Sequence, residues 1–295
     1  MAVKTFYMEY KRREFIKMGG SLAAGLILSP VASDLLSNDT DDKLKAFGIQ
    51  LWTVKKSLAE DPKGVLKQLS ADGYKLIESF QGNKGIYWGM SNTEFKKYMD
   101  ELGMTIISSH CTTGADFETK ANEAAAIGIK YLLNPFVPVQ KTVDDYKKIA
   151  EQFNKNGEIC KKAGIRFGYH NHNHDFKLID NQVPMDIYLQ NTDPALVDFE
   201  MDIYWVVTAN QDPEAWLKKY NNRFRLCHIK DRTKGATIDD ASCILGQGSI
   251  NFPKILKAAK KHGMHYYIVE QERYENTTEM DCAKADAEYL KKIKF

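Results

Sequence analysis

The stretch AGIRFGYHNHNH, residues 163–174, contains the junction that decides the fold of this chain. A helical pattern over residues 143–163 ends at Gly164, and the apolar run of residues 165–169 then predicts a strand. The same junction of helix, glycine and strand recurs at Gly73, Gly103, Gly128 and Gly263. Glycine commonly ends helices because it accepts the left-handed backbone conformation needed there. One connection used this often indicates a regular alternation of helices and strands.

Eight apolar runs predict strands, and eight helical patterns lie between and after them, over ~250 residues. The predicted strands are residues 47–51, 74–79, 104–109, 129–133, 165–169, 196–201, 224–229 and 265–269. The predicted helices are residues 62–71, 94–102, 117–127, 143–163, 185–190, 213–220, 252–261 and 278–291. This count is typical of an α/β protein with a (β/α)8 TIM barrel. The alternative is an open doubly wound sheet, which usually has a glycine-rich loop after its first strand; here WTVK follows.

Residues 1–33 have the order of an export signal: a charged KRREFIK, a weakly apolar run and the small residues VAS. The paired arginines resemble a bacterial twin-arginine signal, although Lys11 stands where Ser or Thr is usual. The apolar run is shorter than the ~20 residues that span a bilayer. We therefore expect a signal peptide, a linker over residues 34–44 and one catalytic domain over residues 45–295, located in the periplasm or otherwise outside the cytoplasm. An attached amphipathic helix is the alternative for the N-terminus.

The composition of the chain limits the kinds of molecule that we expect it to bind. A formal net charge of +2 on 295 residues offers no basic excess for binding nucleic acid. The five cysteines are scattered without CxxC pairs, so they form no recognisable disulfide framework. After removal of the signal, no segment is expected to span a membrane. A small molecule is the expected partner, and the oligomeric state is not predicted.

Polar side chains gather at the ends of the predicted strands, where TIM barrels carry their active sites. These residues are Glu78, His110, His170, His172, Asp202, His228, Lys230, Asp231, Glu270 and Glu272. The last four strands thus end in His, Asp, His and Glu. A mixed set of imidazoles and carboxylates suits Mn²⁺, Zn²⁺, Co²⁺ or Fe²⁺ better than Ca²⁺, which prefers oxygen ligands alone. The pattern predicts one divalent metal with open positions for substrate oxygens.

Such a site favours chemistry on a sugar or keto-sugar. A cation chelated by neighbouring hydroxyl and carbonyl oxygens acidifies the C–H beside the carbonyl, and a nearby Glu can move the proton through an enediolate. Asp198 and Glu200 share a strand face with Asp202, because side chains alternate along a strand. We interpret Asp198 as structural, and Glu200 as either structural or a partner of the ligands.

Two further features bear on substrate binding. Trp52 and Trp88 lie in loops after strands, where aromatic rings can form flat apolar floors for sugars, although core packing is the default role of such rings. The loop GQGSINF, residues 246–252, leads into a helix, and its backbone amides could hold an anion. A flexible turn is the plainer interpretation of that loop.

Six motifs in this order resemble a known family. They are GIQLWT at residues 48–53, GYHNH at 168–172, MDIYW at 201–205, CHIKD at 227–231, GQGSINF at 246–252 and VEQE at 269–272. They resemble the sugar phosphate isomerase/epimerase family of the xylose isomerase-like TIM barrel superfamily, over essentially all of residues 45–295. The resemblance implies a divalent metal, most often Mn²⁺. By position, its ligands would be His170, Asp202, His228 and Glu270.

The resemblance also implies a reaction class. Ketose 3-epimerases of the family carry Glu at the position of His170, and that Glu is one of their two proton-transfer bases. Here Glu270 remains as a base, with His110, Glu78 or His172 as candidates for the second catalytic function. His172 and Lys230 are the expected polar contacts to substrate. The resemblance favours an isomerase or epimerase. A lyase or dehydratase acting on a 3-keto-glycoside or an inosose is the alternative, since one base and one general acid suffice for elimination.

Two other functional classes are alternatives for this chain. The superfamily contains endonucleases that act on abasic DNA with three zinc ions, and the absence of basic excess and the predicted export argue against them. A barrel that binds sugar without turning it over is the alternative of another class. Turnover would separate that binding protein from an enzyme.

Overall fold

The computed structural model describes residues 43–295. The predicted signal segment, residues 1–33, and nearly all of the predicted linker, residues 34–44, lie outside the described residues and stay predictions. Within residues 43–295, no helix is both long and apolar enough to cross a bilayer.

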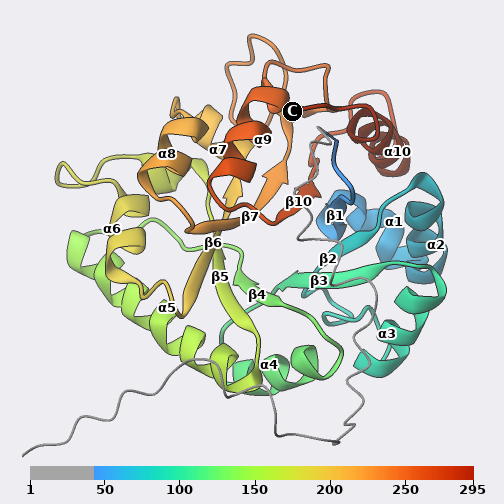
Figure 1. Ribbon diagram of the computed structural model, residues 1–295, viewed down its shortest axis with the longest axis horizontal. Coiled ribbons are helices and arrows are strands. Elements are labelled where there is room, and N and C mark those ends of the chain that lie inside the picture. The colour runs from blue at the N-terminus through green and yellow to red at the C-terminus, as the bar shows by residue number, and fades with distance from the viewer. Residues whose placement is uncertain (1–42) are drawn as a thin grey trace, which may run out of the picture. The chain divides into compact units, whose positions relative to one another are not determined.

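Eight parallel strands close into a barrel (Figure 1). The strands are β1 (Gly48–Gln50), β2 (Leu76–Phe80), β3 (Thr105–His110), β4 (Tyr131–Asn134), β5 (Arg166–His170), β6 (Val197–Asp202), β7 (Phe224–Ile229) and β10 (Tyr266–Val269). Each strand pairs with its neighbours in chain order, and β10 pairs with β1 to close the ring. The predicted (β/α)8 barrel is confirmed, and the open sheet is excluded.

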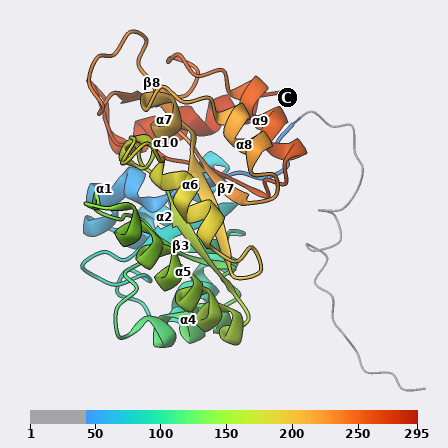
Figure 2. The ribbon, with the colours of Figure 1, turned by 90° about the vertical axis from the view of Figure 1, so that its left-hand side faces the viewer.

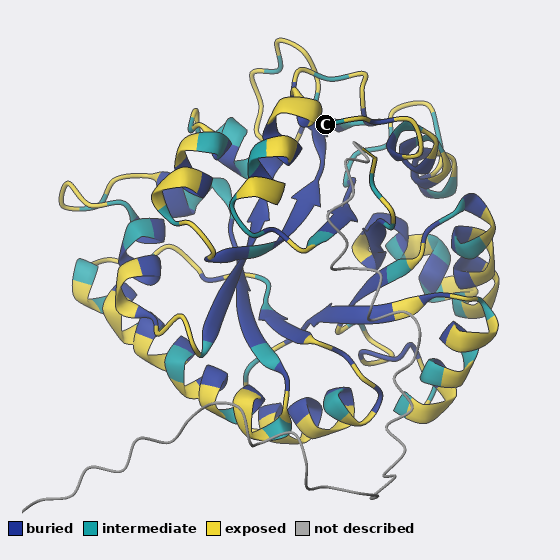
Figure 3. Cartoon of the chain, in the orientation of Figure 1, coloured by how far each residue is buried: buried dark blue, intermediate teal, exposed yellow. Residues whose placement is uncertain are grey.

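Helices surround the barrel, with buried faces toward the strands and exposed faces outward (Figure 3). They are α1 (Lys55–Glu60), α2 (Pro62–Asp72), α3 (Asn92–Glu101), α4 (Phe117–Ala126), α5 (Val143–Ala163), α6 (Pro184–Asn191), α7 (Ile203–Thr208), α8 (Pro213–Lys219), α9 (Phe252–Lys261) and α10 (Glu279–Leu290). The predicted bounds of α5 and α9 agree with the structure. The short helices α1 and α7 were not predicted.

The segment between β7 and α9 contains a small antiparallel hairpin. Its strands are β8 (Asp231–Arg232) and β9 (Ser242–Cys243). Tyr204 of α7 fixes the hairpin, because its hydroxyl accepts hydrogen bonds from the Ala241 amide at 2.7 Å and from Arg232 Nη1 at 3.0 Å. Hairpin and α7 therefore lie together above the ends of the barrel strands (Figure 2).

The glycine junctions work as the sequence predicts. Gly164 ends α5 with a φ of 84°, in the left-handed region that L-residues avoid. Its amide and that of Ile165 close the last turn, the latter with a hydrogen bond of 2.9 Å to the Cys160 carbonyl. The chain then enters β5 directly. This close connection brings the end of β5, and thus its histidines, to the rim of the barrel.

The barrel interior changes from apolar to polar along the strands. A small apolar cluster fills its middle, formed by Ile107, Tyr131, Leu133, Leu226 and Ile268. Toward the strand ends, Glu200 and Asp202 of β6 follow each other on the inward face, and both are fully buried. At the opposite end, Asp198 pairs with Arg166, as expected of a structural residue. TIM barrels usually fill this interior with branched apolar residues, so the polar layer marks the functional end.

A buried acid in α10 gives the stability of the barrel a testable pH dependence. Asp286 Oδ1 accepts a hydrogen bond of 2.8 Å from the Leu245 amide, whereas Oδ2 is buried without a hydrogen-bond partner. Burial raises the pKa of Asp286 to about 8. The folded pKa thus exceeds the unfolded value near 3.8, so its stabilising contribution is complete at low pH and is lost as pH rises toward 8.

Asp286→Asn keeps the acceptor for the Leu245 amide and removes the ionisation. We expect the melting temperature of the variant, relative to the wild type, to rise steadily between about pH 4 and about pH 8 and then level off. The upper limit of this change is about 1.4 kcal/mol per pH unit. Asp100→Asn, at an exposed surface ion pair, is the control. Parallel pH curves for Asp286→Asn and the wild type would contradict the assignment.

Candidate metal centre

Four side chains converge at the ends of β5, β6, β7 and β10, and we call them the outer set: His170, Asp202, His228 and Glu270. One ligand atom from each lies within 4.8 Å of the others, and all four residues are buried. His228 Nδ1 lies 3.2 Å from Glu270 Oε2 and 3.8 Å from Asp202 Oδ2. His170 Nε2 lies 3.9 Å from the same Asp202 oxygen. The structure thus brings together the four ligands predicted by resemblance.

The outer set fits a divalent cation. Asp202 Oδ2 is buried without a hydrogen-bond partner. A buried carboxylate oxygen is costly to leave unsatisfied. Ligands bound to one ion at ~2.1 Å stand roughly 3–3.5 Å apart, close to the spacings seen between His228 and the carboxylates. Two imidazoles and two carboxylates leave coordination positions for substrate. The donor chemistry therefore suits a catalytic ion of the Mn²⁺ or Zn²⁺ type.

A second group lies one layer deeper in the barrel, and we call it the inner set: Glu78, His110 and Glu200. Glu78 Oε1 is 2.7 Å from His228 Nε2 and 2.9 Å from Gln50 Nε2, which donates to it. Glu200 Oε2 is 2.8 Å from His110 Nε2. Both carboxylates are fully buried. Glu78 therefore supports the ring of His228, and His110 supports the carboxylate of Glu200.

The charges of the two sets explain the pKa shifts. Burial opposes the charged form of His228, but Glu200 and Glu270 outweigh it and raise the pKa of this imidazole well above its ordinary value. Burial and the repulsion of Glu78 raise the pKa of Glu200 to about 7. Burial, followed by the neighbouring His228, lowers the pKa of His170 well below its ordinary value. The crowded negative charge that contributes to the raised pKa of Glu200 would also attract a divalent cation.

Lys230 is the cation of the site. It is 1% exposed, and its ammonium donates to Glu272 and, at 3.3 Å, to Glu270. The rings of Tyr204 and Trp205 lie 4.9 Å and 4.8 Å from it. Because carboxylates outweigh the effect of burial, the pKa of Lys230 is raised, and it stays protonated. Lys230 thus offsets the negative charge of Glu270 next to the candidate ion.

His172 stands between the outer set and the barrel mouth. Its ring lies 5.0 Å from that of His170, 5.6 Å from that of Trp205 and 5.3 Å from that of Phe136. Burial and the nearby Lys230 lower the pKa of His172 to about 3, so its imidazole is neutral. Its Nδ1 is buried without a hydrogen-bond partner, and the neighbouring Phe136 is 52% exposed. An unsatisfied polar atom therefore lies on a ring that contacts an exposed aromatic side chain, an arrangement suited to a substrate contact.

The two predicted aromatic contacts differ in position. Trp52 is 39% exposed in the turn after β1, and its ring packs edge-on against Phe80 at 5.0 Å. Trp88 is 4% exposed, and it packs against Phe80 at 4.9 Å. It also lines a hollow of about 770 Å³ beside residues of α2 and α3, such as Lys63 and Glu94. Trp52 is thus open to a ligand near the strand ends, whereas Trp88 lies behind Phe80. Their roles stay predictions.

Two polar residues, Asn171 and Asp231, support the backbone near the site. Asn171 exchanges hydrogen bonds with the backbone of Asp202, at 3.2 Å and 3.3 Å, and so fixes the end of β6. Asp231 accepts hydrogen bonds from the amides of Gly246 and Gly248 at 2.9 Å and of Ile250 at 3.1 Å. The backbone amides of this loop therefore do bind an anion, and that anion is the Asp231 carboxylate of the chain itself.

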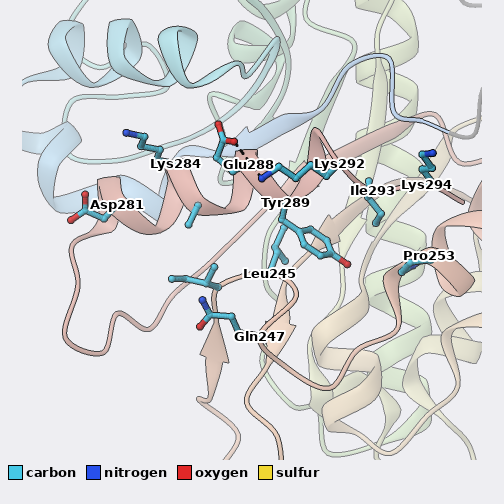
Figure 4. A pocket seen from close by; sticks show the side chains of 12 residues that line it. Leu245, Gln247, Pro253, Asp281, Lys284, Glu288, Tyr289, Lys292, Ile293 and Lys294 are labelled. Atoms are coloured by element: carbon cyan, nitrogen blue, oxygen red, sulfur yellow. Dashed lines mark ion pairs between the residues drawn. The ribbon is translucent and has the colours of Figure 1, made fainter.

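A hollow of about 740 Å³ lies between α10 and the segment of residues 244–253 (Figure 4). Tyr289, Leu245 and the lysines Lys284, Lys292 and Lys294 are among its lining side chains. None of the outer or inner set lines it. The clustered histidines and carboxylates therefore lie at the strand ends and not in this hollow.

Comparison with known proteins fits this geometry. A family model described as xylose isomerase-like TIM barrel matches residues 66–293. The chain belongs to this family. The match spans most of the described barrel, including every residue of the outer set and, in the inner set, Glu78, His110 and Glu200. Membership in the xylose isomerase-like family confirms the superfamily that the motifs predicted.

Similar proteins include a sugar phosphate isomerase/epimerase and inosose dehydratases. A sugar phosphate isomerase/epimerase from Parabacteroides distasonis is 33% identical, with a TM-score of 0.74, over 88% of this chain and 97% of that one. An inosose dehydratase from Clostridium perfringens is 28% identical over 159 residues, which cover 49% of this chain. The chain spans about half the length of the inosose dehydratases that it matches. A zinc-bound structure of the IOLI protein, 16% identical with a TM-score of 0.68, shares the fold.

Sequence reasoning left the role of Glu200 open. The alternation of Asp198, Glu200 and Asp202 placed all three on one face of β6, and the structure agrees. The sequence did not reveal the partner of Glu200, because His110 is 90 residues away along the chain. A glutamate on the inward face of a barrel strand was the available signal, because such a charge is retained only when it is paired.

Proposed function

We propose that this chain is a metal-dependent enzyme that abstracts a proton beside the carbonyl of a sugar or keto-sugar. The observation that carries the proposal is the convergence of the outer set around the buried, unpartnered Asp202 Oδ2. His170, Asp202, His228 and Glu270 would hold the ion, with Mn²⁺ expected first and Zn²⁺, Co²⁺ or Fe²⁺ as alternatives. When bound, the ion would supply the positive charge that stabilises a developing enediolate.

The residues of the chain supply the remaining steps. Glu270 is the most exposed member of the outer set, at 6%, which places its carboxylate nearest to an entering substrate as the proton acceptor. Lys230 stays protonated and can donate a hydrogen bond to a substrate oxygen. His172 offers its free Nδ1 to a hydroxyl. Trp205 and Phe136 shield this space with apolar rings.

Elimination is the second candidate reaction. It is supported by His170, which stands where the family's 3-epimerases carry their second base, so Glu270 is the carboxylate left to start the reaction. The protonated Lys230 could then donate a hydrogen bond to the departing β-group. The similarity to inosose dehydratases also supports this alternative.

The first experiment measures metal content of the purified protein by elemental analysis, beside Asp202→Ala and the surface control Asp100→Ala. We expect about one ion per chain in the wild type and the control, and a large loss in Asp202→Ala, because a direct ligand contributes more than the ~10–100-fold typical of a hydrogen-bond partner. A wild type that holds no metal and gains no stability from added metal would refute the proposal.

The second step identifies the reaction. Keto-sugars and glycosides are incubated with the metal-loaded enzyme in deuterated water and followed by mass spectrometry. Uptake of deuterium with no other change in mass supports isomerisation or epimerisation. Loss of water or of a glycosyl group supports elimination. Sugars that stabilise the protein yet remain unchanged would favour the binding barrel.

A further inference from the structure

His170 and His228 lie between two layers of carboxylates, and their ring nitrogens face in opposite directions. His228 Nδ1 faces Glu270 at 3.2 Å, while its Nε2 faces Glu78 at 2.7 Å. His170 Nδ1 faces Glu200 at 3.2 Å, while its Nε2 points toward Asp202 at 3.9 Å. Each ring therefore presents one nitrogen to the outer set and the other to the inner set.

An imidazole that binds a metal has one nitrogen occupied by the ion in place of a proton, so it cannot donate to both layers. One nitrogen carries a hydrogen and donates, and only the other has a lone pair for a metal. A carboxylate accepts hydrogen bonds, so a ring nitrogen that bonds to Glu78 or Glu200 must carry the hydrogen. That places the hydrogens on Nε2 of His228 and Nδ1 of His170. The lone pairs then lie at His228 Nδ1 and His170 Nε2, which both face the outer set.

The inner carboxylates are themselves held in place. Glu78 accepts 2.9 Å and 2.6 Å hydrogen bonds from Gln50 and Ser108, and Glu200 contacts His110 at 2.8 Å. Glu78 and Glu200 are 0% exposed, so water does not compete for these contacts. We propose that Glu78 and Glu200 are positioning residues that set the tautomers of His228 and His170 and thereby select the outer set as the metal site. This inference rests on the proposed function.

The rival arrangement uses the same histidines differently. His110, His170, Glu200 and His228 also lie close enough to hold an ion. That ion would take His170 Nδ1 and His228 Nε2, so it would exclude the outer ion unless both rings lost a further proton. The outer position is favoured because the rival ion would need His228 Nε2, which already faces Glu78 at 2.7 Å, and Gln50 and Ser108 hold that carboxylate in place.

The test replaces each inner carboxylate separately. Glu78→Met and Glu200→Met remove the acceptor, Glu78→Gln and Glu200→Gln retain an amide oxygen, and Glu101→Met at an exposed helix position is the control. Affinity for Mn²⁺ and Zn²⁺ is measured by competition with a chromophoric chelator. We expect the methionine variants to bind ~10–100-fold more weakly, the control to match the wild type, and the glutamine variants to recover part of the loss.

NMR then reports which nitrogen binds. Protein with isotope-labelled histidine is loaded with a spin-active cadmium isotope, and metal–nitrogen couplings are assigned. The expected couplings are to His170 Nε2 and His228 Nδ1, with Glu200→Met disturbing the His170 signal and Glu78→Met that of His228. Coupling to His110, or to the opposite nitrogen of either ring, would overturn the inference in favour of the inner ion.

The two proposals fail in different ways. A wild type that binds no metal contradicts the proposed function. A wild type that binds metal through the outer nitrogens, with unchanged affinity and unchanged couplings in all four variants, leaves the proposed function standing and overturns the role of Glu78 and Glu200. Circular dichroism of each variant confirms that the barrel has folded before either result is read.

Discussion

His228→Ala is expected to abolish both metal retention and turnover. The ring is fully buried, and it is the only one in the described barrel that contacts both Glu78 and Glu270 through opposite nitrogens. Its removal deletes one metal ligand and the ring nitrogen that faces Glu78 at 2.7 Å. We expect metal affinity to fall by more than ~100-fold. Elemental analysis and deuterium exchange on keto-sugars are the measurements.

His262→Ala is the matched control for that variant. His262 caps α9 at the other end of the barrel, where its Nδ1 lies 2.8 Å from Asn221. The same substitution there should leave both metal content and turnover unchanged. A His228→Ala protein that keeps a full complement of metal and stays active would remove His228 from the site.

Lys230→Met is expected to separate metal binding from catalysis. Methionine fills the space of the side chain, but Glu270 and Glu272 lose their cation in a buried site. Breaking such a pair costs about 3–5 kcal/mol, which lowers the melting temperature by roughly 6–20 °C in a barrel of this size. The metal should remain bound, because the outer set becomes more negative. Turnover should fall by at least ~100-fold through loss of the donor to substrate.

The measurements are a melting curve with and without added metal, elemental analysis and substrate turnover. Lys292→Met, at a side chain that is 78% exposed, serves as the control and should behave as the wild type. Retained turnover in Lys230→Met would show that the ammonium has no part in the reaction. A parallel loss of metal would show instead that Lys230 orders the ligands.

Much of the barrel was predictable because its signals are local. Apolar runs bounded by Gly73, Gly103, Gly128, Gly164 and Gly263 placed the strands within one or two residues of their observed bounds. The short helices α1 and α7 escaped prediction because they are a single turn or two in length. In α7 the run IYWVVT is apolar on all sides, so it has no helical periodicity to detect. Asp202, which caps that helix by accepting from the Trp205 amide, was its only local signal.

The two sets of site residues also differ in how far the sequence predicts them. The outer set could be predicted because each member ends a strand, and the ends of parallel strands meet at one rim. Glu78 and His110 also end strands and were predicted at this rim, but their partners were not, because the contact of Glu78 with His228 joins residues 150 positions apart. The direction of each imidazole also depends on ring rotation within the folded barrel. The burial of Trp88 behind Phe80 could not be predicted either, because a position in a loop does not reveal the direction of the ring.

The Asp231 carboxylate has a consequence for substrate choice. TIM barrels often bind a phosphate group with the loops after their seventh and eighth strands. In this chain, the amides of Gly246, Gly248 and Ile250 in the loop after the seventh strand already surround a fixed negative charge. A phosphoryl group arriving there would meet repulsion and find its donors taken. An unphosphorylated sugar therefore suits this side of the mouth better than its phosphate ester, a preference that paired assays of the two compounds would reveal.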